Sequence, residues 1–304
     1  MSPFLASVVQ ASPVFFDKAR TLEKAGQLIS EAGKNQPQLI LFPEVFIPGY
    51  PRGLIFGTSV GGRTPEGREL FLRYWENSIE VPGKETAQLA QWAKEAKAYV
   101  VIGVTEKDKI SDTLYCTLLY FSPEGHLLHC HRKIKPTAAE RIIWGEGNGS
   151  DLNVLDTILG KIGGLICWEN YMPLARMAMY QQGIEIYLAP TADCRDSWQA
   201  TLTHIACEGR CFVLGCNQYL TKEHYPPELQ KLLSHDHPSL PSTGGSVIIN
   251  PLGKVIAGPL FDKEGIITAE IDHREIIKAK MDFDVIGHYA RPDVFSFEWR
   301  KSNK

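Results

Sequence analysis

Hydrophobic positions along the chain form short apolar runs that alternate with longer stretches of helical spacing. Runs typical of strands occupy residues 4–10, 39–42, 99–104, 114–121, 127–133, 160–167, 184–189, 211–218, 246–250, 255–257 and 266–271. Helical patterns begin after Asp17, near Pro173 and after Asp272, and two more cover residues 86–97 and 197–210. Ser122-Pro123-Glu124-Gly125 predicts a hairpin turn between two of the strands. Parallel-type units mixed with hairpins predict an α/β fold with at least one mixed sheet.

Two segments interrupt this alternation. Residues 50–68 and 221–242 are long and rich in proline with glycine or histidine, which predicts functional or interface loops rather than linkers. The chain shows no internal repeat and no low-complexity segment. We therefore expect one domain over residues 1–304.

Composition narrows the possible functions. The 304 residues carry a formal net charge of -3, which gives no bulk attraction to nucleic acid or anionic lipid. No apolar run approaches the roughly 20 residues that a membrane span needs, and the first residues lack the layout of a signal peptide. Seven cysteines are an odd number and dilute for this length, so no disulfide framework is expected. These features predict a cytoplasmic protein with no nucleic-acid or membrane partner.

One cysteine stands at a position that favours chemistry. Cys167 ends an apolar strand, follows Gly163 and Gly164, and precedes a helix. A thiol at such a turn would lie near oriented N–H groups and the positive end of a helix dipole, and both would lower its pKa. The alternative is a buried, inert cysteine, the common state of free cysteines. Cys207, Cys211 and Cys216 fall within a helix and a strand and are expected in the core.

Two charged residues end strands in the same way. Glu44 follows the run at 39–42, and Lys133 ends the run at 127–133. Each alone could be an ordinary surface charge. Because open α/β sheets gather active residues at the carboxyl ends of their strands, the three together would supply a nucleophile, a base and a cation. That set suits covalent catalysis on a carbon–nitrogen bond.

Longer motifs around these residues resemble the nitrilase superfamily of carbon–nitrogen hydrolases. The similarity is carried by Leu41-Phe42-Pro43-Glu44, by residues 131–137 (HRKIKPT) and by Cys167-Trp168-Glu169-Asn170, and it extends through residues 140–147, 189–193 and 287–293. Cys-Trp-Glu-Asn and Pro-Thr-x-x-Glu-Arg resemble the nitrile-hydrolysing branch. The resemblance implies a four-layer αββα sandwich, no cofactor, and homo-oligomers built from dimers, which some members extend into spirals.

The resemblance also assigns roles. Cys167 would attack the nitrile carbon to form a thioimidate, and Glu44 would be the general base, with a pKa raised towards neutrality by burial. Lys133 would stabilise negative charge that develops on the substrate, with the backbone N–H of Trp168 as a second donor. Glu140 aligns with a second glutamate that positions Lys133 and the substrate. Glu169 is expected outside this set, as a cap of the helix that it precedes.

Side chains near these strand ends could line a substrate cleft. Tyr50, Trp168, Thr191 and Trp198 would give it aromatic and apolar walls, although each aromatic at such a position is more often a core residue. Such a cleft suits an aliphatic, aryl or arylaliphatic nitrile as the small-molecule substrate, and the sequence does not choose among them.

Other functions use the same residues or different ones. An amidase or carbamoyl-amide hydrolase, or a nitrile or cyanide hydratase, would share the Glu-Lys-Cys set, and a non-catalytic member is disfavoured because that set is intact. His126, His129, Cys130 and His131 resemble metal ligands. Strand alternation separates Cys130 from its neighbours, so no metal is expected.

Subunit contacts are expected from the two long segments, the helix after Cys167 and the C-terminal tail, residues 281–304. Apolar residues are frequent between Met281 and Trp299. This composition predicts burial against a neighbouring subunit, with docking on its own subunit as the alternative.

Overall fold

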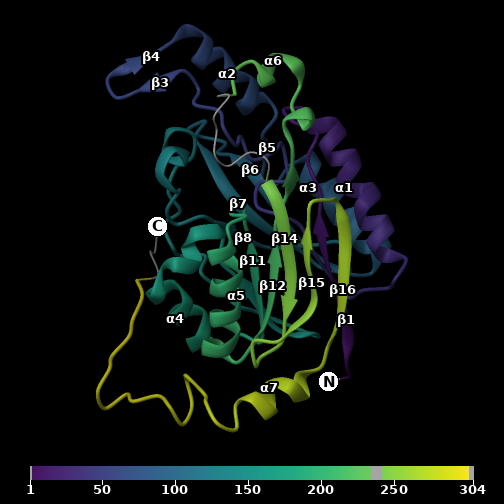
Figure 1. Cartoon of the computed structure of the whole chain (residues 1–304), viewed down its shortest axis with the longest axis vertical. Coiled ribbons are helices and arrows are strands. Elements are labelled where there is room, and N and C mark those ends of the chain that lie inside the picture. The colour runs from purple at the N-terminus through teal and green to yellow at the C-terminus, as the bar shows by residue number, and fades with distance from the viewer. Residues whose placement is uncertain (1, 234–241, 301–304) are drawn as a thin grey trace.

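The computed structural model describes residues 2–233 and 242–300, which form two stacked β-sheets with helices on both outer faces (Figure 1). Apolar side chains between the sheets form the central core, and separate apolar clusters lie beneath the helices of each outer layer. The chain is therefore a four-layer αββα sandwich, as the sequence predicts.

The first sheet has the strand order β16-β1-β2-β6-β7-β8, with β5 beside β6. Its strands are β1 (Phe4–Gln10), β2 (Leu39–Leu41), β5 (Ile79–Glu80), β6 (Tyr99–Lys107), β7 (Leu114–Phe121), β8 (Leu127–Arg132) and β16 (Gly265–Ile271). β1, β2 and β6 are parallel, and β6, β7 and β8 form an antiparallel meander. β1 pairs along its whole length with β16, from Phe4 opposite Ile271 to Gln10 opposite Gly265.

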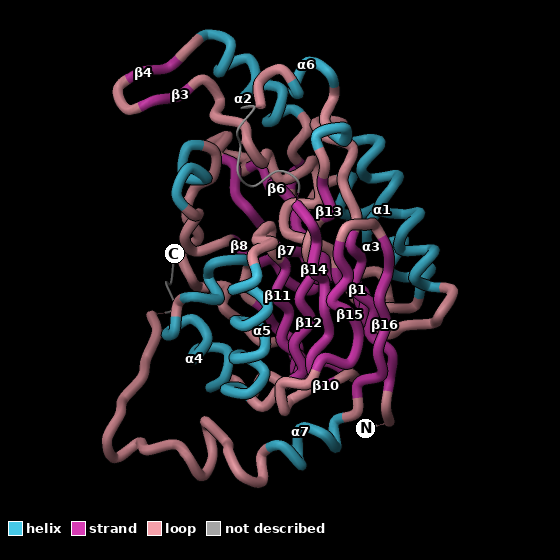
Figure 2. Tube along the Cα trace, viewed as in Figure 1, coloured by secondary structure: helices cyan, strands magenta, loops and turns pink. Residues whose placement is uncertain are grey.

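The second sheet has the order β13-β14-β12-β11-β10-β9, with β15 beside β14. Its strands are β9 (Leu155–Thr157), β10 (Gly160–Gly164), β11 (Ile186–Pro190), β12 (Phe212–Cys216), β13 (Tyr219–Leu220), β14 (Ser242–Ile249) and β15 (Val255–Phe261). β10, β11 and β12 are parallel, so each sheet has a parallel centre with antiparallel strands beside it. Figure 2 shows the strands of the sheets in magenta between the helices.

Helices cover the outer faces. The larger ones are α1 (Lys18–Gly33) and α3 (Lys84–Ala96) on the first sheet, and α4 (Pro173–Gln181) and α5 (Asp196–Gly209) on the second. Asp17 caps α1 by accepting a hydrogen bond from the N–H of Arg20, and α4 begins at Pro173, as expected. α7 (His273–Ala279) follows Asp272, also as expected. None of the helices in the described residues is long and apolar enough to cross a membrane.

The two long segments contain more structure than a loop. Residues 50–68 include the hairpin of β3 (Thr58–Ser59) and β4 (Gly62–Arg63), and the prediction of a loop is wrong at its end, where α2 (Pro65–Glu76) begins. Thr64 caps α2, and Pro65 occupies its first turn. The segment 221–242 contains a 3-10 turn (Lys222–His224) and α6 (Pro227–Gln230), and its residues 234–241 lie outside the described part.

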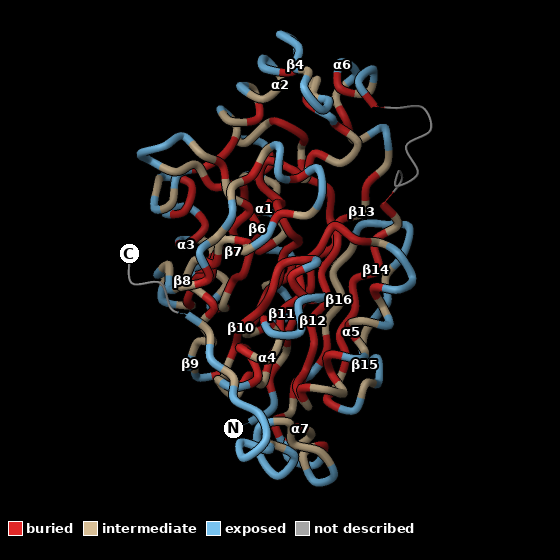
Figure 3. Tube along the Cα trace, turned by 90° about the vertical axis from the view of Figure 1, so that its left-hand side faces the viewer, coloured by how far each residue is buried: buried red, intermediate tan, exposed pale blue. Residues whose placement is uncertain are grey.

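The C-terminal segment after α7 runs over the surface without regular structure (Figure 3). Met281, Tyr289, Val294 and Phe295 are exposed, whereas Val285 and Trp299 pack against the outer core of the second sheet. The segment is thus partly docked on its own subunit and leaves a row of apolar side chains uncovered.

Candidate active site

Four predicted residues meet at one end of the sandwich. Glu44 follows β2, Lys133 follows β8 and Cys167 follows β10, so the first sheet supplies the two charges and the second supplies the thiol. β2 is parallel to β6, and β8 also runs in the direction of β6 because β7 between them is antiparallel to both. β2 and β8 therefore run in the same direction. Their carboxyl ends therefore lie at the same edge. Glu140 joins them from a 3-10 turn, Ala138–Ile142.

The Lys133 ammonium lies between two carboxylates. Its Nζ donates to Glu44 Oε1 at 2.6 Å and to Glu140 Oε2 at 2.8 Å, and its side chain is fully buried. Burial alone would lower the pKa of Lys133, but the carboxylates of Glu44 and Glu140 outweigh it and raise that pKa well above its ordinary value. Lys133 is therefore a fixed cation in the site.

Glu44 has the electrostatics of a base that can both take and return a proton. Burial raises the pKa of its carboxyl, the Lys133 ammonium opposes that shift, and Glu140 adds to it. Its Oε1 accepts from Lys133, while Oε2 has no hydrogen-bond partner among the described residues. One oxygen is thus held in place and the other is available to a proton donor.

The backbone at Glu44 is fixed by close approach to β6. The N–H of Gly103 donates to Pro43 O at 3.1 Å, and the N–H of Phe46 donates to Gly103 O at 2.7 Å. A Cβ on Gly103 would lie 2.4 Å from Pro43 O and 2.8 Å from Glu44 Cα. The site therefore needs glycine at position 103.

Cys167 has a left-handed backbone, with φ at 50°, and only 4% of the residue is exposed. Its Sγ accepts a hydrogen bond from the Thr191 hydroxyl at 3.1 Å. Asn170 holds the turn, because its Nδ2 donates to Leu165 O at 2.9 Å and to Cys167 O at 2.8 Å. Asn170 lies in the Cys-Trp-Glu-Asn motif but had no predicted role, although an amide three residues after a cysteine at a predicted turn was a usable signal.

The expected lowering of the pKa of Cys167 is wrong. Burial raises the pKa of this thiol well above its usual range, and the charge of Glu44 raises it further. α4 begins only at Pro173, beyond a 3-10 turn at Cys167–Tyr171, so no long helix starts at the sulfur. The resting thiol is protonated and depends on a base to become a nucleophile.

Glu140 connects the charged cluster to Tyr50. Its Oε1 accepts from the Tyr50 hydroxyl at 2.6 Å, and its Oε2 accepts from the Thr137 N–H at 2.6 Å as well as from Lys133. Burial raises the pKa of Tyr50 well above its ordinary value, so the phenol remains a donor. Tyr50 thereby fixes the carboxylate that helps to hold Lys133.

A cavity of about 600 Å³ opens onto Cys167 and Glu140. Tyr50 and Trp168 line it, whereas Thr191 does not: it is fully buried behind the thiol, so the prediction that it lines the cleft is wrong. Its apolar walls also include Leu54, Ile55, Ala138, Ala139, Ile143, Trp144 and Ala192. At the rim, Asp193 pairs with Arg195 and accepts from Trp168 Nε1 at 2.8 Å.

Trp198 is not part of this wall. Its side chain is 1% exposed and belongs to the core beneath α5, with Leu202 and Ala206, and its ring meets Tyr171 edge-on at 5.9 Å. The prediction that it lines the cleft is corrected by the direction of the helix, which turns this residue onto the sheet.

Glu169 does not cap α4. Its carboxylate instead accepts from the N–H groups of Ile134 and Ile166, both at 2.6 Å, and lies 3.0 Å from His131 Nε2. His129 and His131 both face Asp151, so they are on one side of β8 as strand alternation predicts. No cluster of three or more His, Cys, Asp or Glu placed to hold a metal occurs within residues 2–233 and 242–300.

The family model for carbon–nitrogen hydrolases matches residues 5–281. The chain belongs to the carbon–nitrogen hydrolase family. Apart from Phe4, the first residue of β1, this match covers every strand and helix described above, including the turns that carry Glu44, Lys133 and Cys167.

Curated relatives of this carbon–nitrogen hydrolase are nitrilases. It is 55% identical over 295 residues to the bifunctional nitrilase/nitrile hydratase NIT4B of Nicotiana tabacum, covering 96% of this chain and 84% of the relative. It is 52% identical to an aliphatic nitrilase of Sinorhizobium fredii strain HH103, covering 97% of this chain and 95% of that relative. It is 50% identical to Nitrilase 1 of Arabidopsis thaliana, covering 95% and 84%.

Solved structures show the same fold at lower identity. Saccharomyces cerevisiae Nit3, from branch 10 of the nitrilase superfamily, has a TM-score of 0.74 at 24% identity over 94% of this chain and 96% of its own. A carbon–nitrogen hydrolase of Helicobacter pylori G27 has a TM-score of 0.76 at 18% identity over 96% and 97%. These likenesses establish the sandwich of this carbon–nitrogen hydrolase.

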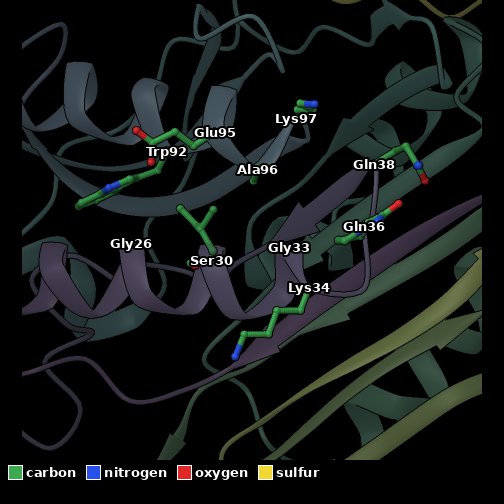
Figure 4. A pocket seen from close by; sticks show the side chains of 12 residues that line it. Gly26, Ser30, Gly33, Lys34, Gln36, Gln38, Trp92, Glu95, Ala96 and Lys97 are labelled. Carbon is green, nitrogen blue, oxygen red and sulfur yellow. The ribbon is translucent and has the colours of Figure 1, made fainter.

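A second cavity of about 600 Å³ lies away from this chemistry, between α1 and α3 (Figure 4). Gly26, Ser30 and Gly33 line it from α1 and Lys34 from the residue after that helix, with Trp92, Glu95 and Ala96 from α3. None of the predicted catalytic or cleft residues of the carbon–nitrogen hydrolase contributes to its wall.

Proposed function

We propose that this chain is a nitrilase that converts an organic nitrile and two waters into a carboxylic acid and ammonia. The observation that carries the proposal is the buried Lys133 ammonium held between Glu44 and Glu140 beside a protonated thiol. The 50–55% identity to curated nitrilases over nearly the whole chain supports nitriles as the substrates.

The first half of the reaction forms a thioimidate. Glu44 takes the Cys167 proton as sulfur attacks the nitrile carbon, and the carbon–nitrogen triple bond becomes a double bond. The Lys133 cation stabilises the charge that develops on nitrogen, which then receives the proton from Glu44. The raised pKa of Glu44 suits this transfer, because the resting carboxylate accepts the thiol proton more readily and, once protonated, is the acid that returns it to nitrogen.

The second half uses two waters. The first adds to the thioimidate carbon and gives a tetrahedral intermediate with sulfur, oxygen and nitrogen attached. Loss of ammonia leaves a thioester, which the second water hydrolyses to the acid and restores the Cys167 thiol. Glu44 acts as the base for each water, and Glu140, fixed by Tyr50, keeps Lys133 in place throughout.

A second outcome is release of an amide. If the tetrahedral intermediate expels the Cys167 thiolate in place of ammonia, one water is consumed and the product is the amide. The relative from Nicotiana tabacum is named a bifunctional nitrilase/nitrile hydratase, which favours this as a minor activity of the present chain. An amidase using the same residues is the remaining alternative.

Ammonia, acid and amide release from a panel of aliphatic, aryl and arylaliphatic nitriles tests the proposal, with the matched amides as competing substrates. Wild type should release ammonia from nitriles, and Cys167→Ala should lose at least about 1,000-fold in kcat. Turnover of amides alone would make the chain an amidase, and no turnover of either would refute the proposal.

Assembly and location are further proposals. We propose a single domain over residues 1–304, whose C-terminal tail from residue 281 joins subunits into dimers or larger homo-oligomers. The uncovered apolar side chains of that tail support this, within the described residues up to 300. A cytoplasmic location is supported by seven cysteines, all of them free.

A further inference from the structure

Glu169 connects the segment after β8, which carries Lys133, to the segment after β10, which carries Cys167. Its Oε1 accepts from the N–H of Ile134, the residue after Lys133, and its Oε2 accepts from the N–H of Ile166, the residue before Cys167. Both distances are 2.6 Å, and the carboxylate is fully buried. β8 and β10 belong to different sheets, so no backbone hydrogen bonds between paired strands fix the distance between them. The Glu169 carboxylate makes this connection instead.

A second carboxylate and a histidine hold Glu169. His131 Nε2 lies 3.0 and 3.2 Å from the two Glu169 oxygens, and Nδ1 lies 2.9 Å from Asp151 Oδ1. Burial alone would lower the pKa of His131, but Glu169 and Asp151 raise it to about 10, so the ring is an imidazolium that donates from both nitrogens. Asp151 Oδ2 also accepts from the N–H of Arg132 at 2.9 Å.

This Asp151–His131–Glu169 bridge therefore accepts hydrogen bonds from the backbone on both sides of Lys133 and on one side of Cys167. Arg132 and Ile134 are tied to its two ends, and Ile166 is tied to Glu169. Its hydrogen bonds go to peptide groups next to the reacting residues, and none goes to Lys133 Nζ or Cys167 Sγ among the described contacts. The bridge therefore contacts the reacting residues through the peptide groups beside them, and it can set their positions.

We propose that Glu169, held by His131 and Asp151, is a positioning residue that sets the distance between the Cys167 thiol and the Lys133 ammonium. This inference rests on the proposed function, because turnover is what that distance governs. A displacement of about 1 Å between reacting groups costs roughly 100-fold in rate. A buried charge cluster with a purely structural role would alter the free energy of unfolding and leave the reactivity of the folded protein unchanged.

Glu169→Gln tests this directly. An amide offers a single acceptor oxygen, so one of the two N–H groups must face an NH₂ group and move away. We expect kcat for the best nitrile to fall about 100-fold while KM changes less than about threefold, because the cavity walls are untouched. The rate at which iodoacetamide alkylates Cys167, followed by mass spectrometry, should fall by at least about tenfold.

Glu106→Gln is the matched control. Glu106 is also a buried carboxylate with a cationic partner, and it accepts from the Thr117 hydroxyl at 2.8 Å and from Arg132 Nε at 3.0 Å. Its bonds go to side chains and not to the peptides beside Lys133 or Cys167. We expect a similar loss of thermal stability, with kcat and the alkylation rate within about threefold of wild type.

His131→Gln supplies a second variant, which keeps both Glu169 oxygens and one donor to them but removes the charge. We expect its kcat to fall about tenfold. If Glu169→Gln does not fold, this variant tests the positioning role in its place. Wild-type kcat and alkylation in folded Glu169→Gln or in His131→Gln, or equal losses in Glu106→Gln, would overturn the inference. Because alkylation needs no nitrile, it tests the bridge even if wild type fails to hydrolyse nitriles.

Discussion

Adding one methyl group at Gly103 should displace the proposed base. A Cβ there would lie 2.4 Å from Pro43 O, 2.5 Å from Val45 N and 2.8 Å from Glu44 Cα, and all three atoms belong to the backbone. The shortest contact is about 1 Å inside ordinary van der Waals distance, so the peptide at Glu44 must move by a comparable amount in Gly103→Ala. Such a shift predicts a roughly 100-fold loss of kcat and about 1–3 kcal/mol of stability.

Steady-state kinetics on the best nitrile and thermal unfolding measure the two effects. Gly33→Ala is the matched control, since its Cβ would meet nothing closer than Ala96 Cβ at 3.8 Å. That variant should keep wild-type kcat and gain up to about 1 kcal/mol of stability, because alanine is the better helix former. A folded Gly103→Ala enzyme with kcat within threefold of wild type would show that Glu44 tolerates the shift, and the reasoning would fail.

Three further predictions follow from contacts already described. Tyr50→Phe removes the donor to Glu140 and should lower kcat/KM by about 10- to 100-fold, measured on the same nitrile, because a hydrogen bond to a charged group contributes about 1.5–3 kcal/mol. The pKa of His131 rises from 6.5 to about 10 on folding, so its stabilisation is complete below about pH 6.5, declines up to pH 10 and is absent above it. Urea titrations across this window should show wild type losing more stability than His131→Gln; parallel curves would contradict the shift. Deleting residues 282–304 should lower the mass in light scattering, whereas a monomeric wild type would exclude the proposed role of the tail.

Much of the fold could be predicted because its strands are short apolar runs with clear turn residues between them. β1, β7 and β8 and the cap of α1 at Asp17 lie where the pattern places them. α2 was missed because only Gly67 and Tyr74 among its residues are buried, so it lacks the strong apolar stripe of a core helix. Thr64 and Pro65 were the signals that remained.

The site residues could be found because strand ends are visible in a sequence, whereas burial is not. The position after each strand pointed to Glu44, Lys133 and Cys167. The pKa of Cys167 was expected in the wrong direction because local dipoles can be inferred from neighbours along the chain, but the desolvation of the thiol depends on both sheets. Contacts such as Glu169 with Ile134, 35 residues apart, likewise have no local signal.

The pairing of β1 with β16 has a consequence for synthesis of the protein. Phe4–Gln10 leaves the ribosome about 260 residues ahead of Gly265–Ile271, its partner on one side. At typical translation rates of about 5–20 residues per second, that edge of β1 stays unpaired for roughly 13–50 seconds. An apolar strand with a free edge can pair with other nascent chains. Expression at low temperature or with added chaperones should therefore raise the yield of folded protein.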